Sequence, residues 1–542
     1  MRSPIIIAIT LLVSATAFSQ SVAENAYWFY FSDKDNNTYQ LDKPEEFLSD
    51  RSIDRRAWQS LPIDETDLPV SQVYIDSLGK LNLEIKHVSK WLNGVLVLST
   101  DTVLIDTLCH ISFIDSIRWM PILTETYFPG VPTMDRFEPA LNVPPSYSYG
   151  PSLTQVSQVK ANFLHQKGYT GAGVHVAVLD VGFLNMPELP AFQKMYDQDQ
   201  LLDSRNFVDK ALDAYQSHGH GTNVSSIIAG NWTDTLIGTA PDATLILALT
   251  ENADSETKVE EFAWIEAAEW VDSLGADIIN TSLGYTQFDD ENTNYIYEDM
   301  DGETAFISRA SGLLTEKGIL SVTSAGNSGN DPWYYIGAPG DASDILTVGA
   351  VDSAGAIASF SSRGPTYDHR IKPEIVAKGV ATIIQSHQGN AAAGNGTSFS
   401  SPVIAGAAAS LWQAYPSMPV KDLIRAIIES SDRSKNPDAT YGYGIPDFGK
   451  AFNVISSAPT SEISVELKAY PNPFREYLNI ELPIISSDEY QIRFYDVQGR
   501  EIFYTFDIVP VRIDIPGSLP PGMYIIELKN DKNTYRGRII KN

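Results

Sequence analysis

The sequence predicts a central α/β domain with a doubly wound, mostly parallel sheet, a small α+β domain before it and a small β-sandwich after it. In residues 151–458, short apolar runs such as "GVHVAVLD" alternate with helical stretches, as strands buried on both faces of a parallel sheet do. Residues 26–120 mix strands and helices within a short length. Residues 459–542 alternate with period two between Gly and Pro turns, which is typical of antiparallel strands.

The first domain should contain three strand regions and three helices. Strands are expected at "AYWFYFSD", on both sides of "WLNG" and at "ISFIDSIRWM", and helices at "KPEEFLSDRSIDRRAWQS", "SQVYIDSLGKL" and "DTVLIDTLCH". The single cysteine, Cys109, ends the last helix, where we expect a small buried thiol. A disulfide within one chain is excluded. The proline-rich stretch that follows, up to residue 150, is predicted to be an exposed, cleavable linker.

The first 19 residues have the features of a secretory signal peptide. Arg2 is followed by an apolar run over residues 4–13, and the small residues Ala17 and Ser19 precede Gln20. The apolar run is too short to span a bilayer, and no later stretch reaches that length. We therefore expect a mature protein without a transmembrane segment.

The charge balance narrows the range of partners. The chain has 38 Lys and Arg residues against 68 Asp and Glu residues, a formal net charge of −30. Such a surface repels phosphate backbones, which argues against nucleic acid as a partner.

Four stretches of the central domain each offer one residue suited to acyl transfer. Asp180 ends an apolar strand, where sites on parallel sheets are built. His220 stands at the entry of the helix in "HGHGTNVSSIIAG", and Asn327 lies in the loop "SAGNSG". Ser398 begins a small-residue helix, whose N-terminus favours developing negative charge. Taken singly, each also has a structural explanation as a turn, cap or core residue.

In their order along the chain, these stretches resemble the subtilisin family of serine proteases, the subtilases. The matching pieces are "VLDVG", "HGTNVSSIIAG", "SAGNSG" and "GTSFSSPVIAG", with "GTAPDATL" and "SFSSRGP" as further landmarks. The resemblance implies a subtilisin-like sheet and a secreted serine endopeptidase. It also implies that Asp180, His220 and Ser398 form the catalytic triad and that the Asn327 side chain donates a hydrogen bond to the oxyanion. It implies no cofactor for the chemistry. The alternative is an inactive subtilisin fold that serves as a surface binding protein.

The resemblance also implies where a protein or peptide substrate binds. Substrate would lie extended along residues 280–284 and pair with the chain as an added strand. The residues expected to contact it are Ser282, Leu283, Gly284, Ala325 and Gly326.

Three departures or ambiguities accompany this resemblance. The family usually has Thr or Ser where this chain has Val181, and Phe399 with Ser400 replace a more usual Met and Ala. His218 lies two residues before His220, which is not the spacing of a zinc pair on a helix. His218 has no catalytic role in this scheme; it either lines the cleft or faces solvent, and we expect the second.

The flanking regions fit the same scheme. By resemblance, residues 20–150 comprise a propeptide, which acts as an intramolecular inhibitor, and its linker, with processing expected within residues 120–151. Residues 459–542 resemble the C-terminal sorting domain of type IX secretion cargo through "YPNPF", "DVQGR", "LPPGMYIIEL" and "YRGRIIKN". This implies contact with that secretion machinery and export through the periplasm to the outer-membrane surface or the medium. The alternative is a generic β-sandwich that binds carbohydrate or protein.

An acidic loop at residues 287–302 leaves one question open. Its carboxylates suit a structural calcium ion, which many subtilases carry, but the spacing is not that of an EF-hand. A solvated acidic loop explains the sequence equally well, and no ligands are assigned.

Overall fold

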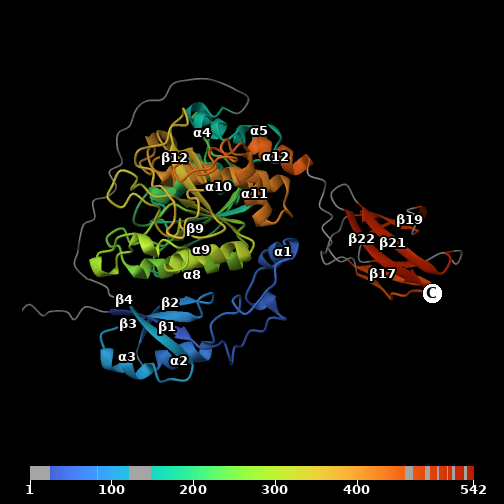
Figure 1. Ribbon diagram of the computed structural model, residues 1–542, viewed down its shortest axis with the longest axis horizontal. Helices are drawn as coiled ribbons and strands as arrows, with labels where there is room; N and C mark the ends of the chain where they lie inside the picture. The colour runs from blue at the N-terminus through green and yellow to red at the C-terminus, as the bar shows by residue number, and fades with distance from the viewer. Residues whose placement is uncertain are drawn as a thin grey trace, which may run out of the picture.

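The computed structural model describes residues 25–81, 83–120 and 148–457, and in the C-terminal part 468–481, 489–496, 500–508, 511–514, 519–529 and 534–542. The predicted signal peptide and most of the predicted cleavage segment, residues 121–147, lie outside the described residues. Figure 1 shows the three described regions along the chain.

The centre of the molecule is a seven-stranded sheet in the order β13-β12-β11-β10-β5-β9-β6, and every neighbouring pair is parallel. This confirms the predicted parallel sheet. The strands are β5 (His175–Asp180), β6 (Leu201–Asn206), β9 (Thr244–Leu249), β10 (Ile278–Thr281), β11 (Leu320–Ser324), β12 (Leu346–Val351) and β13 (Ile375–Lys378).

Alternating residues of the central strands β5, β9 and β10 pack into two separate cores, so the sheet is covered on both faces. Val176 and Val178 of β5 pack into one core, while Ala177 and Leu179 pack into the other. The first face is covered by α4 (Leu153–Gln158), α5 (Ala161–Gln166), α7 (His220–Ala229), α10 (Thr397–Ala414), α11 (Val420–Ser430) and α12 (Phe448–Ser457). The second is covered by α8 (Lys258–Leu274) and α9 (Phe306–Glu316). The prediction of a doubly wound domain is therefore confirmed.

Shorter elements complete this domain: α6 (Gln193–Asp197), β7 (Asn231–Trp232), β8 (Leu236–Ile237), β14 (Thr382–Gln385), β15 (Ala391–Gly394), and the 3₁₀ turns η2 (Gly150–Ser152), η3 (Met186–Glu188), η4 (Pro190–Phe192), η5 (Glu291–Thr293) and η6 (Tyr297–Asp299).

The N-terminal domain is an antiparallel sheet with helices on one face. Its order is β2-β3-β1-β4, built from β1 (Asn25–Phe31), β2 (Glu84–Ser89), β3 (Gly94–Ser99) and β4 (Ile114–Met120). The helices α2 (Gln72–Gly79) and α3 (Thr102–Leu108) cover one face. The opposite face, which includes Trp28 and Leu96, packs into the core of α8 and α9 (Figure 1). The α+β prediction is confirmed, and the core on this second face of the sheet is shared with the central domain.

The first predicted helix is divided in two. A 3₁₀ turn, η1 (Pro44–Glu46), precedes α1 (Asp50–Trp58), and the Ser49 side chain accepts the Ser52 amide at the start of α1. This serine cap starts a new helix where the sequence pattern looked continuous.

The expectation that Cys109 is buried is wrong. Ile105 and Leu108 occupy the buried stripe of α3, and Cys109 follows as the exposed C-cap residue. Its thiol donates to the Asp106 carbonyl at 2.9 Å.

The C-terminal region consists of two antiparallel sheets around a common apolar core. The first contains β16 (Lys468–Tyr470), β17 (Tyr477–Glu481) and β20 (Val511–Asp514), and the second β18 (Glu489–Tyr495), β19 (Glu501–Ile508), β21 (Gly522–Lys529) and β22 (Thr534–Lys541). Phe474, Ile492 and Ile526 are fully buried between them. This strand-rich unit agrees with the predicted small β domain.

Candidate active site

The predicted site residues come together at the carboxyl edge of the central sheet. Asp180 is the last residue of β5, Ser282 follows β10 and Asn327 follows β11, and these three strands are neighbours. His220 and Ser398 are the first and second residues of α7 and α10. Ligands of open α/β sheets bind at this edge.

Asp180 and His220 form a close pair. His220 Nδ1 lies 2.7 Å from Asp180 Oδ1, and the Asp180 side chain has no exposure to solvent. Burial lowers the pKa of His220, but the charge of Asp180 and the hydrogen bond to it outweigh burial and raise that pKa above its ordinary value. Because Nδ1 faces the carboxylate, Nε2 is the nitrogen left to exchange a proton with a substrate or a nucleophile.

Ser398 is joined to the predicted substrate strand by two hydrogen bonds. Its hydroxyl donates to the Ser282 carbonyl at 3.2 Å, and the Ser282 hydroxyl donates to the Ser398 carbonyl at 3.0 Å. The next residue, Phe399, has its ring centre 5.9 Å from that of His220. The Ser398 hydroxyl is thus directed at the Ser282 carbonyl in this structure.

The Asn327 side chain is oriented by Thr397. Its Oδ1 accepts hydrogen bonds from the amide and the hydroxyl of Thr397, both at 2.9 Å. Nδ2 is thereby left to donate elsewhere. The position that a Cβ would take at Gly396, whose φ is +151°, lies 3.7 Å from Asn327 Nδ2 and 3.8 Å from the Ser398 amide. The two donors thus flank one small space, which only glycine at 396 leaves open.

Sequence reasoning did not assign the orienting role to Thr397. The signal was available, since Thr397 directly precedes Ser398 in "GTS".

The two predicted substrate segments lie next to each other because β10 and β11 are adjacent. Gly284 is exposed at the end of the first segment, and the Ser324 hydroxyl donates to the Leu283 carbonyl at 3.4 Å. In the second, Ala325 is buried and the Gly326 amide donates to the Thr397 hydroxyl at 3.1 Å.

The expectation that His218 faces solvent is wrong. It is half-buried, and its Nδ1 accepts the backbone amide of His220 at 3.1 Å. Burial and the neighbouring His220 lower the pKa of His218. His218 thus holds the start of α7, which has no other side-chain cap at Gly219.

Two positions that depart from the family pattern, Val181 and Ser400, take part in hydrogen bonds. The Val181 amide donates to Asp180 Oδ1 at 2.9 Å, and Oδ2 of Asp180 is buried without a hydrogen-bond partner among the described residues. Val181 supplies no hydroxyl at the position where the family usually has Thr or Ser. The Ser400 hydroxyl donates to the Thr397 carbonyl at 2.9 Å inside α10, which is an ordinary helical contact.

Several carboxylates of the acidic loop at 287–302 accept backbone amides, within the loop or, for Asp289, from Glu256 just before α8. Asp289 accepts the Glu256 amide at 3.1 Å, Asp290 accepts the Asn292 amide at 3.0 Å, and Asp299 accepts the Ile296 amide at 2.9 Å. The bonds of Asp290 and Asp299 are typical of turns, in which an Asp side chain accepts a nearby backbone amide.

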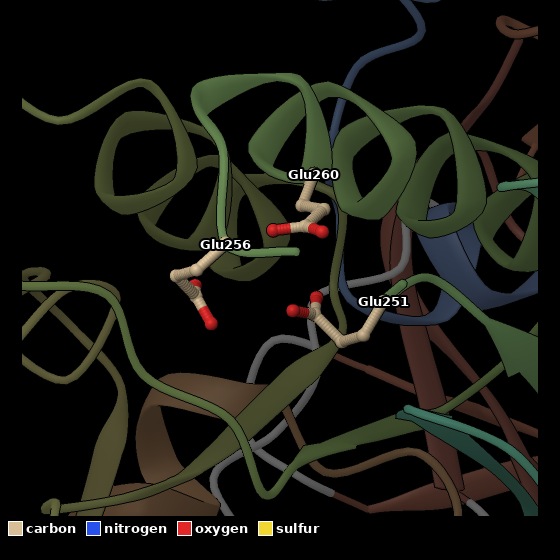
Figure 2. Close-up of side chains that lie close together, drawn as sticks. All are labelled: Glu251, Glu256 and Glu260. Carbon is tan, nitrogen blue, oxygen red and sulfur yellow. The ribbon is translucent and has the colours of Figure 1, made fainter. Parts of the chain in front are cut away.

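A different carboxylate group, which the sequence analysis missed, lies between the end of β9 and the start of α8. Oxygen atoms of Glu251, Glu256 and Glu260 all lie within 4.8 Å of one another (Figure 2). Burial, together with repulsion from neighbouring carboxylates, raises the pKa of Glu256 to about 8 and those of Glu251 and Glu260 well above their ordinary values. The Tyr285 hydroxyl donates to Glu251, and the Thr257 amide to Glu260 at 2.9 Å as part of a capping box. Carboxylate oxygens suit hard cations, and their protonation is the other way to relieve this repulsion.

None of the helices in the part of the chain that the structure describes has the length and hydrophobicity needed to cross a bilayer.

Three family models match the chain in separate regions. The model described as "Subtilase family" matches residues 171–444, "Peptidase S8 propeptide domain, Bacteroidota" matches residues 26–128, and "Secretion system C-terminal sorting domain" matches residues 468–542. Together they bear out the three resemblances seen in the sequence.

Two sequence relatives and one solved structure are also similar to this chain. Subtilisin BL of Lederbergia lenta is 31% identical over 292 residues, which cover 54% of this chain and 94% of the relative. The serine protease AprX of Bacillus subtilis is 28% identical over 340 residues, 57% of this chain and 71% of the relative. The epidermin leader peptide processing serine protease of Staphylococcus aureus is similar in fold, with a TM-score of 0.55 at 18% identity, covering 81% of this chain and all of that one.

Proposed function

Because the chain belongs to the subtilase family and is a subtilisin-like serine endopeptidase, we propose that it cleaves peptide bonds through an acyl-enzyme formed on Ser398. Ser398 Oγ attacks the scissile carbonyl carbon while His220 Nε2 takes its proton. The proton then passes to the leaving amine, and water releases the acyl group by the reverse sequence. The observation that carries this proposal is the 2.7 Å contact between His220 and Asp180, which orients the imidazole and stabilises its charged form.

The same proposal assigns the oxyanion and substrate contacts. Asn327 Nδ2 and the Ser398 amide donate to the carbonyl oxygen as it becomes an anion, which matters most at the transition state. The substrate backbone pairs with residues 282–284 on one side and with Ala325 and Gly326 on the other.

The proposed chemistry uses no cofactor, because each proton transfer and each charge is handled by side chains or backbone amides. Calcium would be structural. Melting of the purified chain with and without a chelator tests this expectation, because a structural ion raises the melting temperature by mass action.

The competing function is binding without catalysis. Labelling with a fluorophosphonate probe separates the two, since the probe reacts only with an activated serine. We expect the wild type and Ser400→Ala to be labelled and Ser398→Ala to be unlabelled. Cleavage of a chromogenic peptide by Ser398→Ala should fall by about 10⁶-fold, the size of the effect in subtilisin itself. Near-normal cleavage by that variant would sink the assignment.

The matched flanking regions support a propeptide that inhibits the enzyme and a tail that leads to export. We propose that the tail is recognised by the type IX secretion machinery after passage through the periplasm, so that the enzyme reaches the cell surface or the medium. Deletion of residues 459–542 should leave the protein in the periplasm. Mass spectrometry of the mature termini should place the processing sites within 120–151 and near the tail.

A further inference from the structure

An asparagine lies in the middle of the central sheet, among apolar side chains. Asn280 is the third residue of β10 and is fully buried, and the residues beside it are Val178 of β5 and Val322 of β11. Its Oδ1 has no hydrogen-bond partner among the described residues. A buried amide with an unpaired oxygen lowers stability, and proteins keep such costly groups chiefly at functional sites.

The nitrogen of the Asn280 amide contacts Ser282, at the carboxyl end of the same strand. Nδ2 donates to the Ser282 hydroxyl oxygen at 3.0 Å, and both side chains are buried. Successive residues of a strand face opposite sides, and Ile278 packs into the core that includes α10. The side chain of Asn280 therefore also faces α10, the helix that carries Ser398.

The bonds of the Ser282 hydroxyl leave only one assignment of its proton. A hydroxyl has one proton to donate and two lone pairs. A carbonyl can only accept, so this proton goes to the Ser398 carbonyl, 3.0 Å away. The Ser401 hydroxyl, 3.1 Å from that of Ser282, must then donate to it, as Asn280 does. The Ser282 hydroxyl is thus fully used, and two donors fix the direction in which it points.

The Ser398 carbonyl has a specific need for this donor. In a regular α-helix, the carbonyl of residue 398 accepts the amide N–H of residue 402. Residue 402 is proline, which has no N–H and whose ring crowds the carbonyl four residues earlier. The Ser282 hydroxyl therefore supplies the hydrogen bond that Pro402 cannot give.

This bond and the contacts of Asn327 hold Ser398 from two sides. Thr397, the residue before it, donates its amide and its hydroxyl to Asn327, both at 2.9 Å, while the Ser398 carbonyl is held by Ser282. The two anchors fix the backbone that carries both the hydroxyl and the amide of Ser398. A misplacement of about 1 Å in such a group can cost on the order of 100-fold in rate.

We propose that Asn280 is a positioning residue for Ser398 and acts through the Ser282 hydroxyl. Its amide keeps the Ser282 proton directed at the Ser398 carbonyl, at the cost of an unpaired buried oxygen. The inference rests on the proposed function, in which Ser398 is the nucleophile.

The test replaces Asn280 with leucine, which has nearly the same shape and no polar atom. We expect kcat for a chromogenic peptide and the rate of fluorophosphonate labelling to fall by roughly 10-fold, the size of one buried hydrogen bond, with little change in KM. The melting temperature, measured with Ser398→Ala to prevent self-cleavage, should stay or rise because the unpaired oxygen is gone. A residue that only stabilised the fold would lower the melting temperature when replaced.

The matched control is Thr323→Val on β11, the strand beside β10. The Thr323 hydroxyl is likewise buried without a hydrogen-bond partner among the described residues. This variant should keep both kcat and the labelling rate. If Asn280→Leu does not fold, Asn280→Val takes its place, since valine already lies on both sides of this position.

A double-mutant cycle tests the route through Ser282. Ser282→Ala should lower the labelling rate at least as much as Asn280→Leu, and adding Asn280→Leu to it should cost nothing further. Unchanged kcat and labelling in Asn280→Leu would overturn the proposal, and so would a full additional loss in the Ser282→Ala background. Failure of the proposed function is seen separately, as a wild-type chain that the fluorophosphonate does not label.

Discussion

The imidazole of His220 and the carboxylate of Asp180 lie 2.7 Å apart, and solvent does not reach the carboxylate. The charge of Asp180 therefore acts on His220 with little screening, and it raises the pKa of His220 although burial alone would lower it. A base must be deprotonated before it can accept a proton from Ser398. The acid limb of the pH–rate profile should therefore report the pKa of His220 as Asp180 sets it.

We predict that kcat/KM of the wild type rises with pH through a pKa above the ordinary 6.5 of histidine. Asp180→Asn should lower that pKa, because the favourable charge is gone, and should reduce turnover by about 10⁴-fold, as in other triads. The pH dependence of peptide hydrolysis measures both. Asp254→Asn, at an exposed loop position, serves as control. An acid limb unmoved by Asp180→Asn would show that His220 does not titrate in this range.

The two histidines of the "HGHG" stretch should differ sharply. His220→Ala removes the proposed base and should abolish turnover. His218→Ala removes one hydrogen bond to the amide of His220, a loss of about 1 kcal/mol, and should keep most of the activity. Steady-state kinetics of the two purified variants measures their turnover. Loss of turnover in His218→Ala with activity kept in His220→Ala would reassign the base to His218.

Thr397 should act through Asn327. Asn327→Ala is expected to lower kcat by about 10²- to 10³-fold with little change in KM, because the lost donor matters at the transition state. Thr397→Val removes the hydroxyl that bonds Asn327 Oδ1 and should lower kcat in the same manner but less, while Thr397→Ser should restore it. If Thr397→Val lowers kcat just as much in an Asn327→Ala background, the two residues act independently.

The sequence predicted the fold where burial follows a simple period. Continuous apolar runs became the parallel strands, because both faces of the sheet are covered and every residue of β9 to β12 except Thr244 is buried. The four motif residues could be singled out because each stands at the end of a strand, in the loop that follows one or at the start of a helix, positions that leave marks in the sequence.

The errors and omissions concern contacts that no sequence pattern marks. His218 was expected to face solvent because nothing in the sequence shows that its ring turns back to the His220 amide, two residues away. The Arg55–Asp272 pair spans more than two hundred positions in the sequence, and no local pattern announces such a buried contact. The sequence analysis did not single out Glu251, Glu256 and Glu260, because only the turn into α8 brings their carboxylates together.

The Glu251–Glu256–Glu260 group should make stability fall as pH rises. The folded-state pKa of Glu256, about 8, lies above the ordinary 4.5, so the folded chain holds a proton that the unfolded chain has lost. Its stabilising contribution is therefore fully present below about pH 4.5 and is lost as pH rises through 8. In a chelating buffer, the melting temperature of Ser398→Ala should decline between pH 5 and 9. Adding Glu256→Gln should flatten that decline and raise the melting temperature at pH 9, whereas Glu291→Gln, at an exposed carboxylate, should change neither. Equal slopes for the Glu256→Gln chain and its parent would mean that Glu256 is ionised in the folded protein at neutral pH.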